Sequence, residues 1–342
     1  MAKWYENSVV NDGIVISSRV RLARNVKKFP FPVQMKQEEA EEVLKMVKDA
    51  VMNDRTPLAN TFLFRRVDTL PMEEKRTMVE SHIISPVLAQ QQKPCAVMVK
   101  DDETVSIMIN EEDHVRIQTI CRREDIDAAW DLADKLDNLI EETVEYAYHE
   151  QAGFITACPT NMGTGLRASF MVHVPSLEKT GQMPHLSRTL SRFGITVRGI
   201  YGEGSDSLGG IYQISNQITL GQSEEEIIKN LKNAIHLVKE QEQKARKAIR
   251  EKDEVAYEDQ VYRALGVLEQ ARRISANEAA QCLSLLREGA QEGIFHWNYP
   301  KTMYQIFIET QPCHMQQGGS KTAAQRDVAR ANLLRQVFRG SH

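Results

Sequence analysis

Four short segments of this 342-residue sequence place arginines beside hydroxyls, carboxylates or a cysteine. The first segment, residues 16–22, reads Ile-Ser-Ser-Arg-Val-Arg-Leu. On a β-strand, Ser17, Arg19 and Arg21 share one face and the apolar residues share the other. Two guanidinium groups on one face suit a polyanionic ligand, because arginine donors match pairs of phosphate oxygens. The alternative is an edge strand that its charges keep soluble.

The second segment, residues 104–116, leads from alternating apolar residues into three consecutive acids at 111–113. If the segment is extended throughout, Asn110, Glu112, His114 and Arg116 share one face. Three adjacent carboxylates are costly to bring together unless a cation lies among them. The pattern therefore indicates a carboxylate that binds a positively charged substrate, with an acidic turn after a strand as the alternative.

The third segment, residues 157–167, is a glycine-rich loop with a cysteine at its start, Ala-Cys-Pro-Thr-Asn-Met-Gly-Thr-Gly-Leu-Arg. Gly163 and Gly165 permit a close approach of the backbone to a ligand, and Cys158 stands in the same loop as Arg167. The sequence has no phosphate-binding G-x-x-x-x-G-K-[ST] loop and no helical G-x-G-x-x-G context. A functional thiol is one interpretation of Cys158, and a buried structural cysteine is the other.

The fourth segment, residues 197–207, again combines an arginine with a glutamate. Arg198 and Glu203 stand in a glycine-rich stretch that precedes an apolar run at 211–220. This arrangement predicts a hairpin with a long loop, which is also its simplest interpretation without any function.

Strands and helices must position these segments over the first two thirds of the chain, and helices dominate after residue 251. The apolar patterns predict strands at 97–99, 104–109, 153–156, 168–174 and 212–220, and helices at 125–149 and 223–250. Ser223 with Glu226 and Ser275 with Glu278 have the spacing of capping boxes, and Pro300 is suited to the first turn of another helix. A boundary is expected near residue 253.

Composition excludes several classes of protein. The 43 Lys and Arg nearly balance the 47 Asp and Glu, which argues against a basic nucleic-acid coat. No apolar run approaches 18 residues, so a membrane span is not expected. The five cysteines include no Cys-x-x-Cys pair, which disfavours a disulfide framework or a thiolate zinc site and favours the reducing cytoplasm.

Taken together and in this order, the four segments resemble the motifs of the guanidino (phosphagen) kinases over roughly residues 14–245. The resemblance implies an α+β catalytic domain at 14–250, with an antiparallel β-sheet flanked by helices, and a small all-helical domain at 254–339. It also implies the cofactors ATP and Mg²⁺. The magnesium is expected to be held mainly by ATP oxygens and water, so no protein ligand is assigned.

The resemblance also assigns roles to residues. Glu112 and Glu203 would hold the guanidino group, with Glu112 as the base. Cys158 would add negative charge and orientation without a covalent role. The residues expected to bind ATP are Ser17, Ser18, Arg19, Val20, Arg21, His82, Arg116, Arg167, Ala168, Ser169, Phe170, Met171, Arg198, Gly199, Ile200, Tyr201, Gly202 and Glu203.

Near the end of the chain, residues 326–331 resemble the Arg-Asp-x-x-Arg-Ala motif of the bacterial protein arginine kinases of the McsB type. In that family the motif forms a pocket for phosphoarginine. The resemblance therefore implies an allosteric pocket at Arg326, Asp327, Arg330 and Ala331, in which the two arginines lie at i, i+4 on one helix face. A basic, solvated helix is the alternative.

The resemblance predicts a cytoplasmic protein arginine kinase that marks proteins for Clp-type degradation and regulates a stress-response repressor. It implies a zinc-binding activator protein and a homodimer, with no nucleic-acid or membrane partner. Sixteen residues precede Ser17, where small-molecule phosphagen kinases place a helical domain that closes over the substrate, so we expect a site open to protein side chains. A kinase of free arginine or another small guanidino compound, and a non-catalytic adaptor that recognises phosphoarginine, are the alternatives.

Overall fold

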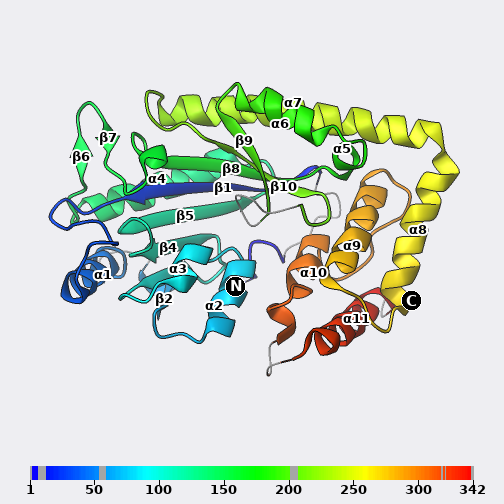
Figure 1. Cartoon of the computed structure of the whole chain (residues 1–342), viewed down its shortest axis with the longest axis horizontal. Helices are drawn as coiled ribbons and strands as arrows, with labels where there is room; N and C mark the ends of the chain where they lie inside the picture. Colours follow the sequence, from blue (N-terminus) through cyan, green and yellow to red (C-terminus); the bar gives the residue numbers. More distant parts are fainter. Residues whose placement is uncertain are drawn as a thin grey trace. The chain divides into compact units, whose positions relative to one another are not determined.

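The computed structural model describes residues 2–6, 13–53, 59–200, 207–316, 319 and 321–339. Figure 1 labels most of the elements. The strands are β1 (Val15–Arg24), β2 (Phe62–Arg66), β3 (Ala96–Lys100), β4 (Val105–Ile109), β5 (Val115–Arg122), β6 (Tyr148–His149), β7 (Gly153–Phe154), β8 (Leu166–His173), β9 (Ile195–Gly199) and β10 (Ile211–Asn216). The helices are α1 (Gln37–Val51), α2 (Met72–Glu80), α3 (Pro86–Gln90), α4 (Ile126–Glu141), α5 (Pro175–Lys179), α6 (Met183–Ser191), α7 (Glu224–Lys252), α8 (Glu254–Gln270), α9 (Ala276–Gln291), α10 (Met303–Glu309) and α11 (Ala323–Arg339).

An eight-stranded sheet runs in the order β2-β3-β4-β5-β1-β8-β10-β9. The ladders from β2 through β5 to β1 are antiparallel, and β6 with β7 forms a separate antiparallel ribbon. Every described element after β10 is helical. These features confirm the predicted α+β class, with an antiparallel sheet flanked by helices.

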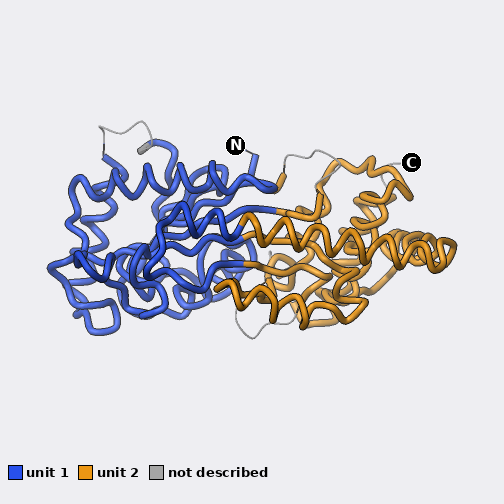
Figure 2. Tube along the Cα trace, turned by 90° about the horizontal axis from the view of Figure 1, so that it is seen from above, with its two compact units in different colours: residues 1–4, 17–169, 215–231 blue, residues 5–16, 170–214, 232–342 orange. Residues whose placement is uncertain are grey.

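The chain divides into two compact units, shown in blue and orange in Figure 2. The first comprises residues 1–4, 17–169 and 215–231, and the second comprises residues 5–16, 170–214 and 232–342. In the second unit, α8 packs on α9 and α11, and α10 packs on α9. Across the described ranges, no helix combines the length and the apolar character that crossing a membrane requires.

The two faces of the sheet in the first unit differ in chemistry. One face packs on α4: Val20 and Leu22 of β1 are fully buried, and the Thr119 hydroxyl donates to the Ala129 carbonyl at 2.7 Å. On the other face, strands β3 and β4 carry an apolar cluster that includes Val97 and packs under α2 and α3. Further along this face, β5 and β1 carry arginines instead.

The long helix predicted at 125–149 ends early, at Glu141. Beyond it the chain turns through residues 142–144 and then leads into the strand β6, with Val144 and Tyr146 buried and Thr143 and Glu145 exposed. The spacing of three or four residues wrongly predicted that the helix continues past Glu141. Val144 and Tyr146 also fit the alternation of an extended chain, which β-branched and aromatic residues favour.

Other boundaries follow from their capping residues. The Ser223–Glu226 capping box is confirmed, since Ser223 Oγ accepts from the Glu226 amide at 3.2 Å and Glu226 accepts in return at 3.0 Å. Ser275 likewise caps α9. Pro300 does not open a helix as predicted, because Thr302 provides the cap and α10 begins at Met303. The strand predicted at 212–220 ends at Asn216.

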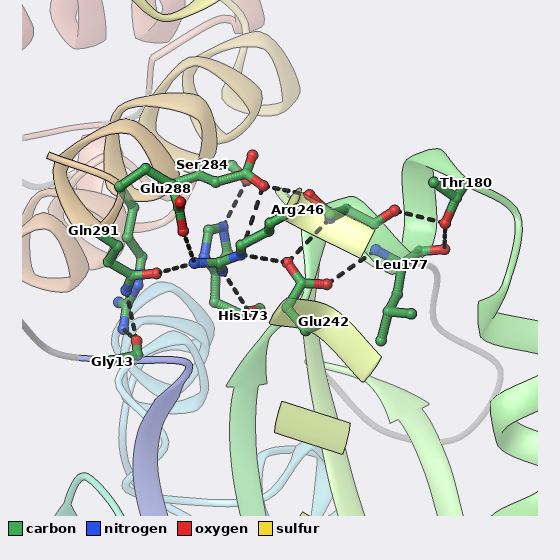
Figure 3. Close-up of polar contacts among 12 residues, drawn as sticks. Gly13, His173, Leu177, Thr180, Glu242, Arg246, Ser284, Glu288 and Gln291 are labelled. Carbon is green, nitrogen blue, oxygen red and sulfur yellow. Dashed lines mark hydrogen bonds and ion pairs between the residues drawn. The ribbon is translucent and has the colours of Figure 1, made fainter. Parts of the chain in front are cut away.

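A buried ionic cluster joins three helices of the second unit, α5, α7 and α9 (Figure 3). Arg246 of α7 lies 2.8 Å from Glu242 and 3.6 Å from Glu288 of α9, and all three side chains are almost fully buried. Glu242 also accepts from the backbone amides of Ser176 and Leu177 at the start of α5. One guanidinium thus neutralises two carboxylates that water cannot reach, which is the condition under which buried charge is tolerated.

Candidate active site

Arginines from two neighbouring strands share one face of the sheet. Arg19 and Arg21 lie on β1, and Arg116 lies on β5. The register pairs Arg21 with Gln118 and Arg116 with Ala23, and residues that are opposite each other in an antiparallel ladder point to the same side. The predicted placement of the β1 arginines on one face is therefore observed, and Arg116 joins them.

Arg21 lies at the centre of this cationic group. Burial, followed by the charges of Arg19, Arg116 and Arg167, lowers the pKa of Arg21 well below its ordinary value. Its Nε atom is buried and has no hydrogen-bond partner among the described residues. A buried N–H group without an acceptor, next to other positive charges, is energetically costly. The arginine group is therefore suited to bind an anion with several oxygen atoms.

His82 covers part of the arginine face. It lies between α2 and α3 with a positive φ of 60°, and its carbonyl accepts from Gln118 Nε2 at 2.7 Å. Burial, and to a lesser extent the charge of Arg19, lowers the pKa of His82 to about 3, so the ring is neutral near pH 7. The other end of the loop is fixed because Ser85 donates to Glu111. The loop thus brings the predicted nucleotide contact His82 beside Arg19.

The acidic segment is a hairpin turn after β4, so of the two interpretations left open by the sequence, the acidic turn is the one observed and the fully extended one is not. The amide of Asn110, which has a φ of 59°, donates to the His114 carbonyl at 2.9 Å and closes the turn between β4 and β5. The three acids consequently point to different places. The Glu111 side chain is fully buried and lies 2.7 Å from Arg116, whereas the Glu112 side chain is 42% exposed and lies 3.2 Å from the same arginine.

Asp113 and His114 hold the hairpin to the rest of the unit. Asp113 Oδ1 accepts from the Ala157 amide and from Asn25 Nδ2, both at 2.7 Å. His114 Nδ1 accepts from the Val26 amide at 2.9 Å, so its Nε2 carries the proton and donates to the Pro30 carbonyl. Burial lowers the pKa of His114 to about 4. Of the three acids, only Glu112 therefore remains accessible to a substrate.

Cys158 precedes a short 3₁₀ turn, Pro159–Asn161, at the start of the glycine-rich loop. Its Sγ lies 3.1 Å from the Thr160 hydroxyl, and the residue is half-buried rather than enclosed in the core. The Ala157 amide donates a hydrogen bond to Asp113, so the hairpin that carries Glu112 contacts the loop that carries Cys158 directly. The site therefore has a carboxylate and a thiol on two loops that share one anchor.

The two loop glycines have a structural reason beside the predicted one. Both have positive φ angles, and each approaches a neighbouring segment of the chain closely. A Cβ on Gly163 would lie 2.4 Å from the Thr219 carbonyl oxygen, and one on Gly165 would lie 2.5 Å from Arg24 Nη1. Glycine is required here so that the loop can pack on its neighbours.

Arg167 extends the cationic group from β8. Its Nη2 donates to Asn161 Oδ1 at 3.1 Å, so it contacts the loop that begins at Cys158. Its Nη1 lies 3.4 Å from the Asn216 carbonyl. These contacts hold the guanidinium between the end of β10 and the loop that begins at Cys158 (the thiol loop), where its charge acts on Arg21.

Several residues expected to bind ATP have side chains that point elsewhere. Ser18 donates to the Arg123 carbonyl at 2.6 Å, and Val20 is fully buried on the face toward α4. Ala168 and Phe170 of β8 are also fully buried. For these four, side-chain contact with a nucleotide is incompatible with the packing. Ser17, Ser169 and Met171 are buried too.

The fourth segment is described only in part. Arg198 is half-buried on β9 in the second unit, followed by the buried residues Gly199 and Ile200. Tyr201, Gly202 and Glu203 lie outside the described residues.

The C-terminal motif lies on α11 of the second unit. Arg330 is only 1% exposed, and it donates to the carbonyls of Thr310 at 2.7 Å and Ile274 at 2.9 Å. It also lies 2.8 Å from Asp327 Oδ1, whose side chain remains 20% exposed. Arg326 is half-buried. The structure brings Asp327 and Arg330 together but uses Arg330 inside the fold, and Ala331 is buried.

Comparison with known proteins identifies the family. The chain is 45% identical over 323 residues to the protein-arginine kinase of Caldanaerobacter subterraneus subsp. tengcongensis, covering 94% of this chain and 96% of that protein. It is 40% identical over 340 residues to the protein-arginine kinase of Brevibacillus brevis, covering 99% and 95%. This chain belongs to the protein-arginine kinase family. Residues 42–245 match the ATP:guanido phosphotransferase C-terminal catalytic domain, and residues 254–342 match the protein-arginine kinase McsB C-terminal domain.

Solved structures show that this member of the protein-arginine kinase family has a phosphagen kinase fold. The duplicated taurocyamine kinase from Schistosoma mansoni matches with a TM-score of 0.61 at 23% identity, over 70% of this chain and 34% of that one. Lombricine kinase matches with a TM-score of 0.60 at 22% identity, over 71% and 69%. The family membership makes the chain an ATP-using phosphotransferase.

Some residues of this protein-arginine kinase family member were not predicted to belong to the site. Gln118 could have been found, because it is two residues beyond Arg116 on a strand and therefore shares its face. Glu111, Asp113 and Asn25 could not, since their roles depend on a turn geometry and on contacts between segments far apart in the sequence.

Proposed function

We propose that this protein transfers the γ-phosphoryl group of ATP to arginine side chains of proteins and so forms phosphoarginine. The observation that carries the proposal is the arginine face with the exposed carboxylate of Glu112 at its edge. Arg116 contacts both parts, since its guanidinium belongs to the arginine group and lies 3.2 Å from Glu112. A site for a polyphosphate thus adjoins a site for a cation, which is what transfer from ATP to a guanidinium requires.

The residues fit the phosphates of ATP on structural grounds. Arg21 has a buried Nε without a partner in the described part of the chain, and three further arginines act on it. Phosphate oxygens would supply the missing acceptor and offset the repulsion among the guanidinium groups. When bound, Mg²⁺ would neutralise charge on the phosphate oxygens, and ATP and water would supply its ligands. We assign Arg198 to the same phosphates from the family motif.

The phosphoryl acceptor, which is the substrate guanidinium, needs more help from the protein than the phosphoryl donor ATP does. A guanidinium is protonated at neutral pH and is then a poor nucleophile. We assign Glu112 to accept the proton as the new N–P bond forms and the bond from the γ-phosphorus to its bridging oxygen breaks, releasing ADP. Glu203 would hold a second nitrogen of the substrate guanidinium, and Cys158 would add negative charge near the same guanidinium. Phosphoryl transfer asks little more of the protein than this positioning and charge balance.

Mass spectrometry of a casein-like protein after incubation with ATP tests the proposal. We expect mass increases that map to arginine, provided the samples stay near neutral pH because N–P bonds are labile in acid. A parallel reaction with free arginine, followed by phosphorus NMR, tests the alternative substrate. Phosphate on serine, threonine or tyrosine, or on free arginine alone, would contradict the proposal.

We also propose the cellular partners that the family resemblance implies. Phosphoarginine would mark proteins for a Clp ATPase and its protease, and modification of a stress-response repressor would regulate its activity. A zinc-binding activator protein and a homodimer belong to the same proposal, as does a cytoplasmic location. Co-purification of the protein with each partner, with and without ATP, is the direct measurement.

An allosteric phosphoarginine pocket at Arg326, Asp327, Arg330 and Ala331 completes the proposal, and Arg326 is its best probe. Arg330 is unsuitable, because removing it would leave two buried carbonyls and Asp327 without their donor, at about 3–5 kcal/mol of stability. We expect Arg326→Ala to reduce the activation of turnover by added phosphoarginine about tenfold.

The ratio of turnover with and without free phosphoarginine is the quantity to measure for this variant. Arg263→Ala is the matched control, since Arg263 is an exposed arginine on α8 that is paired with Asp259 of the same helix. Equal activation ratios in the Arg326 variant, the control and the unmodified protein would remove the pocket from the proposal.

A further inference from the structure

Asn25 follows β1 and is 2% exposed, and both polar atoms of its side chain form hydrogen bonds to segments of the candidate active site. Its Nδ2 donates to Asp113 Oδ1 at 2.7 Å and to the Ile155 carbonyl at 3.1 Å. Its Oδ1 accepts from the His114 amide at 2.9 Å. One side chain therefore binds the acidic hairpin on one side and the chain leading into the thiol loop on the other.

Asp113 completes this connection. It is fully buried, and the oxygen that accepts from Asn25 also accepts from the Ala157 amide at 2.7 Å. Asp113 directly follows Glu112, and Ala157 directly precedes Cys158. A single carboxylate oxygen of the residue after Glu112 thus binds the backbone amide of the residue before Cys158.

We propose that Asn25 and Asp113 are positioning residues that set the distance between Glu112 and Cys158. The proposal rests on the function proposed above, in which those two side chains face the substrate guanidinium. Neither positioning residue touches substrate, because both are buried behind the loops. A displacement of about 1 Å at reacting groups can lower a rate about 100-fold, so the pair controls turnover through geometry alone.

To distinguish a positioning role from a merely structural one, the effect of Asn25→Ala on turnover is measured twice. One measurement is made with Glu112 present, and the other is made in a Glu112→Gln background. We expect turnover to fall 10- to 100-fold in the first case and less than about threefold in the second, because the pair acts through Glu112. Affinity for ATP should stay within about twofold, since Arg19, Arg21 and Arg116 are placed by strands β1 and β5. Equal losses in both backgrounds would mean a merely structural role and would overturn the proposal.

Alkylation of Cys158 by iodoacetamide provides a readout that does not depend on activity. We expect its rate in Asn25→Ala to rise about fivefold or more, with half-buried Cys121 in the same molecule as the internal reference. If Glu112→Gln has normal turnover, the proposed base is wrong, and the Cys158 rate still tests the pair. An unchanged rate in Asn25→Ala would then overturn the positioning role.

Two further variants separate the contact from charge and from stability. Asp113→Asn keeps an oxygen that can accept from Asn25 and Ala157, so we expect it to retain turnover within about fivefold, whereas Asp113→Ala should resemble Asn25→Ala. Equal damage from both Asp113 variants would show that charge matters and would contradict the proposal. Thr119→Val is the control for stability, because it removes one buried hydrogen bond to Ala129 on the face of the sheet that packs on α4. If Asn25→Ala does not fold, Asn25→Ser takes its place in all three measurements.

Discussion

Glu112→Gln is expected to lower turnover about 1,000-fold while ATP binding stays within about threefold. The amide has nearly the same shape as the carboxylate and can still accept from Arg116, which lies 3.2 Å from Glu112, so the arginine face is preserved. The amide cannot take the proton that the substrate guanidinium must lose, and removing a general base costs about 10²–10⁴ in rate. Steady-state turnover with a protein substrate and calorimetric titration with ATP measure the two quantities.

Glu145→Gln is the matched control for this prediction. Glu145 is an exposed glutamate of the same unit, paired on the surface with Lys27, and its replacement changes the charge by the same amount. We expect this control to have normal turnover. A Glu112→Gln variant as active as the control would exclude Glu112 as the base.

Stability is expected to fall as the pH drops below 6.5, because buried histidines must take up protons on unfolding. Burial lowers the pKa of His82 to about 3 and that of His114 to about 4 in the folded protein. Above pH 6.5 both rings are neutral in either state. Between pH 6.5 and 4 only the unfolded chain binds these protons, so unfolding is favoured by about 2 kcal/mol for each ring at pH 5. His173 in the second unit acts in the same direction.

The slope of unfolding free energy against pH tests this expectation, because it counts the protons taken up. Asp113 and Glu288 have raised pKa values and work in the opposite direction, so the histidines are isolated by comparison with His114→Gln. This variant should be less stable at pH 7 but should lose less on acidification. NMR titration of the ring signals gives a second check, and a midpoint near pH 6.5 for His114 in the folded protein would contradict the prediction.

The sequence carried enough information to predict the first arginine strand. Alternation along β1 is governed by local backbone geometry, so the placement of Arg19 and Arg21 opposite the core residues Val20 and Leu22 followed directly. The antiparallel α+β class and the Ser223 capping box were also predictable, because both have strong local or motif signals. The assignment of roles to individual residues came from the family resemblance.

What could not be predicted depended on contacts between distant segments. The acidic run was compatible with a strand or a turn, and the turn is selected because Asp113 and His114 are satisfied by residues almost 90 positions earlier. Asn25 had no signal of its own, since a single asparagine after a strand is unremarkable until its partners are known. The glycines of the thiol loop were noticed, but only the fold shows that they accommodate Thr219 and Arg24.

The ionic cluster of the second unit has a consequence for how this sequence can diverge. Arg246 is the shared counter-charge of Glu242 and Glu288, and losing it would strand two anions in a dry interior. Evolution can therefore exchange these three positions for apolar side chains only as a set, through concerted rather than stepwise change. Homologues should accordingly carry the whole triplet, or none of it, or, where the arginine alone is replaced, a compensating cation from another helix.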